Sequence, residues 1–93
     1  MRSDDTLLEF PCEYHVKAMG RPDAAGSGDD FRALVIALVA AHVDHLDKDS
    51  VSSNPSSAGK YLAVTVRFQA ESKVQLDAIY QSLTDEPRVL VAL

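Results

Sequence analysis

The sequence contains no tryptophan and only one cysteine, Cys12, among its 93 residues. A single cysteine excludes an intramolecular disulfide and a zinc site built from several cysteines. Glu13 follows Cys12 directly, and no cation stands next to it in the sequence to stabilise a thiolate. We therefore interpret Cys12 as a small, partly buried side chain rather than a reactive thiol.

Long hydrophobic runs and concentrations of positive charge are also missing. No stretch approaches the roughly 18 apolar residues of a membrane span, and the first residues, Met1 to Asp5, lack the pattern of a signal peptide. Nine basic side chains against fourteen acidic ones give a net charge of −5, which disfavours contact with phosphate backbones. We expect a cytoplasmic protein with no nucleic-acid and no membrane partner.

The remaining composition is that of an ordinary globular protein, with 46% hydrophobic and 25% charged residues. It predicts one domain over residues 1–93. Within that domain we expect a partly ordered N-terminal segment, 1–10. The turn-forming residues of 21–29 predict a flexible loop.

Alternating apolar and polar residues predict the strands. Tyr14, Val16 and Ala18 alternate with the residues of the opposite face, and the segment 61–69 has the clearest alternation in the chain. The polar segment 47–53 predicts an edge strand. The apolar segment 88–93 predicts a last strand within the sheet.

Two segments have the spacing of amphipathic helices. The first begins at Asp29 or Asp30, which predict an N-cap. Its apolar face comprises Phe31, Leu34, Val35, Leu38, Val39, His42 and Leu46. A second apolar line on this helix, Ile36, Ala40 and Val43, needs cover from the loop or from a partner.

The second helix is introduced by Ser72 and Gln75, which form a capping box, and it ends before Pro87. The predicted order is β-α-β-β-α-β. Right-handed crossovers then place both helices on one face of a four-stranded antiparallel sheet, a ferredoxin-like α+β sandwich. The opposite, open face is expected to carry Lys17, Met19, Tyr61, Ala63, Thr65, Arg67, Leu90 and Ala92.

The stretch SNPSSAGKYLAVTVRF, residues 53–68, contains the AGK tripeptide that ends a phosphate-binding loop. The match fails because Asn54 stands where that loop needs its first glycine, and Tyr61 where it needs serine or threonine. The stretch also leads into a strand, whereas a phosphate loop leads into a helix. We interpret it as a hairpin turn shaped by Pro55 and Gly59, with a polar tip of Ser56, Ser57 and Lys60.

The segment HVDHLDKD, residues 42–49, holds the one cluster of plausible metal ligands. Its spacing is not specific, so we favour a histidine that packs in the core and a solvated helix end over a metal site. RNA binding is disfavoured as well, because Tyr61 is the one outward aromatic on its strand and the chain is acidic. No catalytic, cofactor-binding or metal-binding residue is assigned, and we expect a binding module rather than an enzyme.

Two longer stretches, LLEFPCEYHVKAMG and SNPSSAGKYLAVTVRFQAESKVQLDAIYQSL, resemble the YbeD-like family of small bacterial proteins. The resemblance implies the same βαββαβ fold and a likeness to ACT-type regulatory domains, which bind small effectors at sheet-edge dimer interfaces. It implies no established activity, although some members are encoded beside lipoate-attachment genes. The positions that carry it are Glu9, Phe10, Pro11, Lys17, Gly20, Pro55, Ser56, Ser57, Gly59, Tyr61 and Tyr80.

These observations lead to two functional hypotheses. The first is a non-catalytic ACT-like regulatory or small-ligand-sensing domain without a cofactor. Such a domain is either a monomer or a homodimer that forms through the open face or an edge strand. The second is an adaptor that docks on a metabolic enzyme through the line Ile36, Ala40 and Val43. An enzyme of lipoate metabolism is one candidate for that partner. The candidate surface for a ligand or partner comprises Lys17, Ser56, Ser57, Gly59, Lys60, Tyr61 and Arg67.

Overall fold

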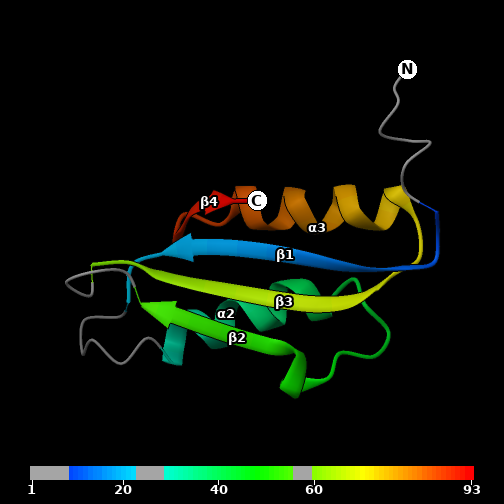
Figure 1. Ribbon diagram of the computed structural model, residues 1–93. Coiled ribbons are helices and arrows are strands. Elements are labelled where there is room, and N and C mark those ends of the chain that lie inside the picture. Colours follow the sequence, from blue (N-terminus) through cyan, green and yellow to red (C-terminus); the bar gives the residue numbers. More distant parts are fainter. Residues whose placement is uncertain (1–8, 23–28, 56–59) are drawn as a thin grey trace.

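The computed structural model describes residues 9–22, 29–55 and 60–93 (Figure 1). Its elements follow in the order β1 (Cys12–Gly20), α2 (Asp29–Ala40), a 3-10 turn η1 (Lys48–Ser50), β2 (Val51–Pro55), β3 (Leu62–Ala70), α3 (Lys73–Asp85) and β4 (Val89–Ala92). This order confirms the predicted α+β, ferredoxin-like fold. In the described ranges, no helix has the length and apolar character needed to cross a membrane.

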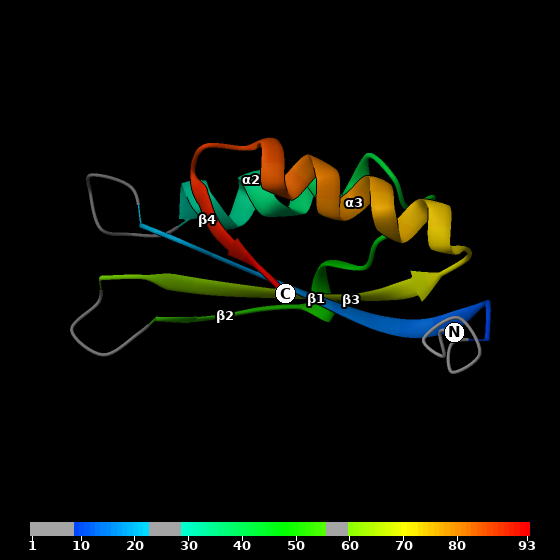
Figure 2. The same ribbon diagram turned by 90° about the horizontal axis from the view of Figure 1, so that it is seen from above.

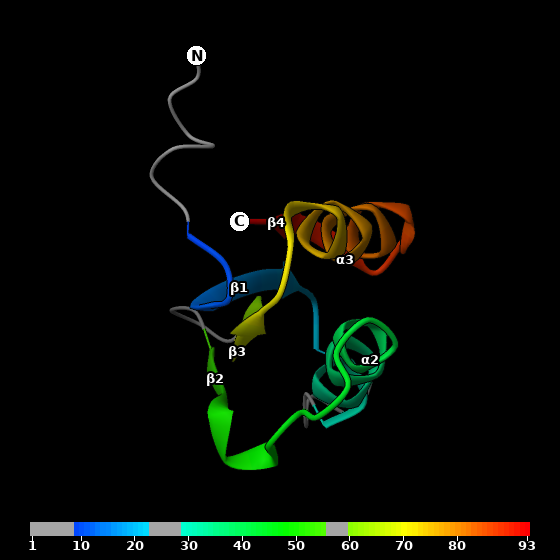
Figure 3. The same ribbon diagram turned by 90° about the vertical axis from the view of Figure 1, so that its right-hand side faces the viewer.

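The sheet has four strands in the order β2-β3-β1-β4, and every neighbouring pair is antiparallel. Its centre is the pair β1 and β3, which runs without interruption from Cys12 opposite Ala70 to Gly20 opposite Leu62. Strand β2 lies at an edge, as its polar sequence predicts. Figures 2 and 3 show both helices on the same side of this sheet, and no other described element covers the opposite side, the open face.

The core lies between the helices and the sheet. The alternating apolar residues of β1 and β3 point into it, as predicted, and both helices contribute one apolar stripe each. Its fully buried larger side chains are Phe31, Ile79, Leu83, Val16, Val35, Val39, Val64 and Val66. Burying one side chain of this size stabilises the fold by about 1.5–3 kcal/mol, so this layer dominates stability.

Helix α2 is shorter than its apolar spacing predicts, because it ends at Ala40. The chain tightens into a turn there, where the His42 N–H donates to the Val39 carbonyl at 3.0 Å. The His42 carbonyl then accepts from the Gln75 side chain of α3 at 2.8 Å. His42 and Leu46 were therefore wrongly placed on the helix, since a contact with α3 overrides the continuing apolar pattern.

The second apolar line of α2 does not form an exposed strip. Ile36 and Val43 are half-buried and pack against the core, and of the line only Ala40 is exposed. The loop residues 23–28, which were expected to cover this line, lie outside the described ranges.

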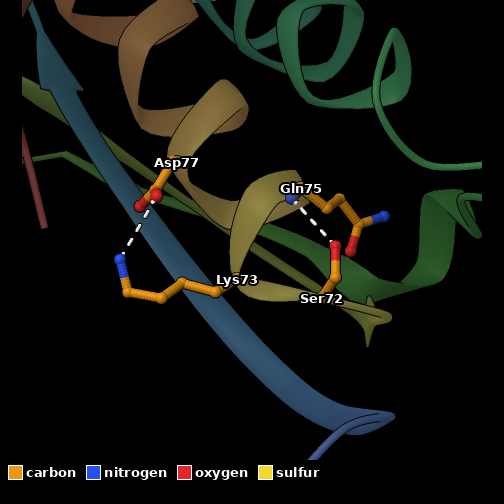
Figure 4. Close-up of polar contacts among 4 residues, drawn as sticks. All are labelled: Ser72, Lys73, Gln75 and Asp77. Carbon is orange, nitrogen blue, oxygen red and sulfur yellow. Dashed lines mark hydrogen bonds and ion pairs between the residues drawn. The ribbon is translucent and has the colours of Figure 1, made fainter. Parts of the chain in front are cut away.

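Helix α3 begins with the predicted cap (Figure 4). The Gln75 N–H donates to Ser72 Oγ at 3.1 Å, while Gln75 Oε1 accepts from the Glu71 N–H at 2.7 Å. In a standard capping box the Gln75 side chain would accept from the N–H of the cap residue, Ser72. Here it accepts from the residue before the cap, Glu71. Lys73 and Asp77 form an exposed ion pair at 3.3 Å along the next turn.

Strand β4 corrects the prediction for the open face. Val91 stands opposite Met19, whereas Ala92 stands opposite Ala18 and packs against the core. The register shifts between Met19 and Gly20, so that Leu90 has no partner on β1. This irregularity breaks the strict alternation from which Ala92 was wrongly assigned to the open face, whereas Leu90 is exposed.

Gly20 marks a close approach between β1, α2 and the start of β4. A Cβ at this position would lie 2.5 Å from the Arg88 carbonyl oxygen and from Cζ of Phe31. Glycine is therefore required here because there is no space for a side chain.

Candidate functional site

The predicted ligand or partner surface is only partly assembled in the structure. Ser56, Ser57 and Gly59 lie outside the described residues. Lys17 on β1 and Arg67 on β3 are both exposed, and the register places them diagonally on the open face, since Thr65 is opposite Lys17. The two cations therefore belong to one surface.

Lys60 and Tyr61 do not join that pair. They precede Leu62, the first residue of β3, whereas Arg67 lies near the other end of the strand. At about 3.3 Å per residue, roughly 20 Å of strand separates Tyr61 from Arg67. The predicted surface divides into a turn region and an Arg67 region.

The surroundings of Arg67 are polar on the open face. His15 stands directly opposite it on β1, and the His15 ring lies 3.6 Å from the Glu13 carboxylate. Both of these side chains are more than half exposed. Arg67 thus stands opposite an imidazole ring, with a carboxylate two positions away along β1 on the same face.

Two adjoining hollows begin at this end of β3. One, of about 220 Å³, is lined by Glu13, His45, Asp47, Ser50, Arg67, Phe68 and Gln69. The other, of about 350 Å³, is lined by His42, Val43, Asp44, His45, Gln69, Glu71 and Gln75. Because His45 and Gln69 belong to both, the hollows form one groove between the α2–β2 connection, the end of β3 and the start of α3.

Hydrogen bonds hold the walls of this groove in place. His42 Nε2 lies 2.8 Å from Ser82 Oγ, and its carbonyl is held by Gln75. On the other wall the Asp49 N–H donates to Asp47 Oδ1 at 2.9 Å, and the Ser50 N–H donates to the Asp47 carbonyl at 3.0 Å. The groove is therefore formed by contacts that do not depend on a ligand.

Of the sequence features, only the segment 42–49 falls on this groove, and we interpreted it as a packed histidine and a solvated helix end rather than as a binding surface. Within the part of the chain that the structure describes, no group of three or more His, Cys, Asp and Glu side chains could hold a metal ion. His42 is engaged with Ser82 instead. Gln69 and Gln75 were missed as groove residues, because nothing in a strand or a helix cap marks a side chain as lining a hollow.

Tyr80, a position of the family resemblance, has a packing role. Its hydroxyl lies 3.3 Å from the hydroxyl of Tyr14, whose ring packs against Phe68 with centroids 6.2 Å apart. Burial, followed by the hydrogen bond to Tyr14, raises the pKa of Tyr80 above its ordinary value. Tyr80 therefore stays protonated at neutral pH and joins α3 to β1.

Comparison with protein families shows to which family the chain belongs. A family model described as "Protein of unknown function (DUF493)" matches residues 5–93. The chain belongs to the DUF493 family. This match confirms the predicted kinship with YbeD-like proteins, and it attaches no activity to any residue.

Curated relatives of the DUF493 chain have nearly the same length. A UPF0250 protein of Paraburkholderia phytofirmans is 37% identical over 90 residues, which cover 97% of this chain and 96% of the relative. A UPF0250 protein of Nitrosomonas europaea is 33% identical over 91 residues, covering 98% and 99%. One of Chromobacterium violaceum is 38% identical over 87 residues, covering 94% and 92%. No solved structure matches the chain.

Proposed function

We propose that this DUF493-family chain is a non-catalytic, small-ligand-sensing domain that binds a polar molecule in the groove at the end of β3. The observation that supports this proposal is the pair of adjoining hollows with preformed walls. The larger hollow, at about 350 Å³, falls at the lower end of the roughly 300–1,000 Å³ typical of small-molecule sites.

The charges along the groove favour a ligand that carries both signs. In the smaller hollow, Arg67 offers a guanidinium, which pairs well with a carboxylate or a phosphate. Glu13 and Asp47 line the same hollow and would face a cationic group of the ligand. A small molecule with one anionic and one cationic group therefore fits better than a purely anionic effector.

The adaptor hypothesis has less support. It relied on the line Ile36, Ala40 and Val43 as a docking strip, yet Ile36 and Val43 pack against the core. A single exposed alanine offers too little apolar area for a stable interface.

The ligand proposal is tested by NMR titration of the full chain with a panel of small metabolites, zwitterions included. Binding in the groove shifts the amide signals of His45, Arg67 and Gln69. Arg67→Gln should weaken that binding at least about tenfold, as expected for the loss of one charge-assisted contact. Lys60→Gln is the matched control, since Lys60 is an exposed cation at the other end of β3.

The proposal would be overturned by either of two results. One is a chain whose groove signals respond to no member of the panel. The other is a ligand whose affinity falls equally in both variants, which would place its site away from Arg67.

A further inference from the structure

The two neighbours of β1 differ in length. Strand β3 pairs with β1 along its whole course, from Cys12 to Gly20. Strand β4 pairs only with the end of β1, from Gly20 back to Ala18, and one more backbone pair joins Lys17 to Leu93. In the described ranges no strand follows on this side, so the edge from Cys12 to Val16 is uncovered.

The backbone of this free edge is oriented for pairing. The Lys17 N–H donates to the Leu93 carbonyl at 3.0 Å, and the Leu93 N–H donates to the Lys17 carbonyl at 2.8 Å. Because alternate residues of a strand direct their N–H and C=O groups to the same side, those of His15 and Glu13 face the same edge as Lys17. Among the described residues, these two donors and two acceptors have no strand partner.

Helix α3 already covers the inner side of the free edge. Tyr80 of α3 reaches Tyr14 of β1, as their hydroxyl contact shows. Lys73 and Asp77 precede Tyr80 by seven and three positions, so they share its face of the helix. A strand added here would lie beneath a helix that is already in place.

The exposed side chains near the edge carry both signs of charge. Glu13 and Lys17 lie on β1, and Lys73 lies 3.3 Å from Asp77 on α3. A strongly acidic or strongly basic segment would therefore meet a like charge, which favours an uncharged segment. The residues 89–93 of the chain itself, VLVAL, are uncharged and pair with the same side of β1.

The length of the free edge favours a peptide over a second copy of the chain. Five residues of strand span about 16 Å. An interface of that length buries far less than the roughly 1,000 Å² that a stable dimer needs.

We infer that an extended, uncharged segment of another protein adds as a strand antiparallel to β1 along Cys12 to Val16, in line with β4. The backbones of Glu13 and His15 supply the hydrogen bonds, and α3 supplies the cover. This strand-addition site is independent of the proposed ligand groove and goes beyond it.

The test uses the full chain and a synthetic, end-capped peptide with the sequence of residues 89–93, VLVAL. Hydrogen exchange followed by NMR reports on individual amides. Without peptide, the amides of Glu13 and His15 should exchange rapidly, and saturating peptide should slow them by about tenfold or more. Two further peptides carry N-methyl groups at alternate positions.

The methylated peptides form the matched control. Since only alternate amides of an added strand face β1, one methylated peptide should lose binding while the other retains it. Equal behaviour of the two would overturn the proposal, as would slow exchange of Glu13 and His15 before any peptide is added. A failure of the unmodified peptide at millimolar concentration, or protection confined to β2, would overturn it as well.

Sedimentation of the peptide-free chain adds an independent arm. A monomer over the working range agrees with the proposal. A concentration-dependent dimer that protects the amides of Glu13 and His15 would assign the edge to a second copy and overturn it.

Discussion

The two faces of the sheet differ although the same strands form both. On β3, Val64 and Val66 are fully buried on the helix side, whereas Arg67 between Val66 and Phe68 is exposed on the open side. No polar or charged side chain is buried within the described residues. The difference shows that alternation along one strand separates side chains that form the core from side chains that face solvent, so that either set can be altered alone.

The sharpest test of this separation compares two adjacent residues of β3. Phe68→Ala removes a ring that is 6% exposed and that packs against Tyr14, so we expect the free energy of unfolding to fall by about 3–5 kcal/mol. Arg67→Gln should change it by less than about 0.5 kcal/mol. Urea unfolding of both variants measures the contrast, and equal losses would contradict it.

Gly20→Ala adds one methyl group to the helix side of β1. The new Cβ would overlap the Arg88 carbonyl and the Phe31 ring, and we expect a loss of about 1–3 kcal/mol. Combining it with Phe31→Leu should show a favourable coupling, because the ring is one of the two obstacles. A double-mutant cycle by urea denaturation measures this coupling, and strict additivity would argue against the overlap with Phe31.

Ser72→Ala tests the cap that orients α3 over the sheet. Loss of the bond from the Gln75 N–H should lower the free energy of unfolding by about 1 kcal/mol. Ser53→Ala, at an exposed position of the edge strand β2, is the control and should lie within about 0.5 kcal/mol of the parent. If both serines behave alike in thermal unfolding, the cap contributes nothing.

Tyr80→Phe tests the contact between α3 and the first half of β1 through pH. Because the pKa of Tyr80 is raised on folding, its contribution is fully present below pH about 10, the ordinary tyrosine value, and is lost as the pH rises above it. The stability of the parent should therefore fall more steeply above pH 10 than that of the variant. Chemical denaturation between pH 8 and about 11 compares the slopes; identical slopes would contradict the raised pKa.

Much of the fold follows from local patterns. The alternation in 14–19 and 61–69 places β1 and β3 correctly, because both strands keep one buried face along their length. The errors arise where tertiary contacts decide. Helix α2 ends at Ala40, just before His42, whose carbonyl accepts from the Gln75 side chain of α3, and β4 loses its alternation at a register shift next to Gly20.

The site was less accessible to sequence reasoning. Arg67 was predicted as a candidate from its outward position on the best strand, and in the structure it lines the groove. The opposite wall comes from a segment twenty or more positions earlier in the chain, and only folding brings His45 and Asp47 beside Arg67. The spacing of residues within one segment does not show which distant segment packs beside it, so the groove could not be predicted as one surface.

The uninterrupted pairing of β1 with β3 also constrains how the protein reaches its native state. The paired residues lie roughly fifty positions apart in the chain, so the centre of the sheet forms only after a long loop has closed. The β2–β3 hairpin, by contrast, joins neighbouring segments. We expect folding to be slower than for a helical bundle of this size. The β2–β3 hairpin should form before β1 pairs with β3.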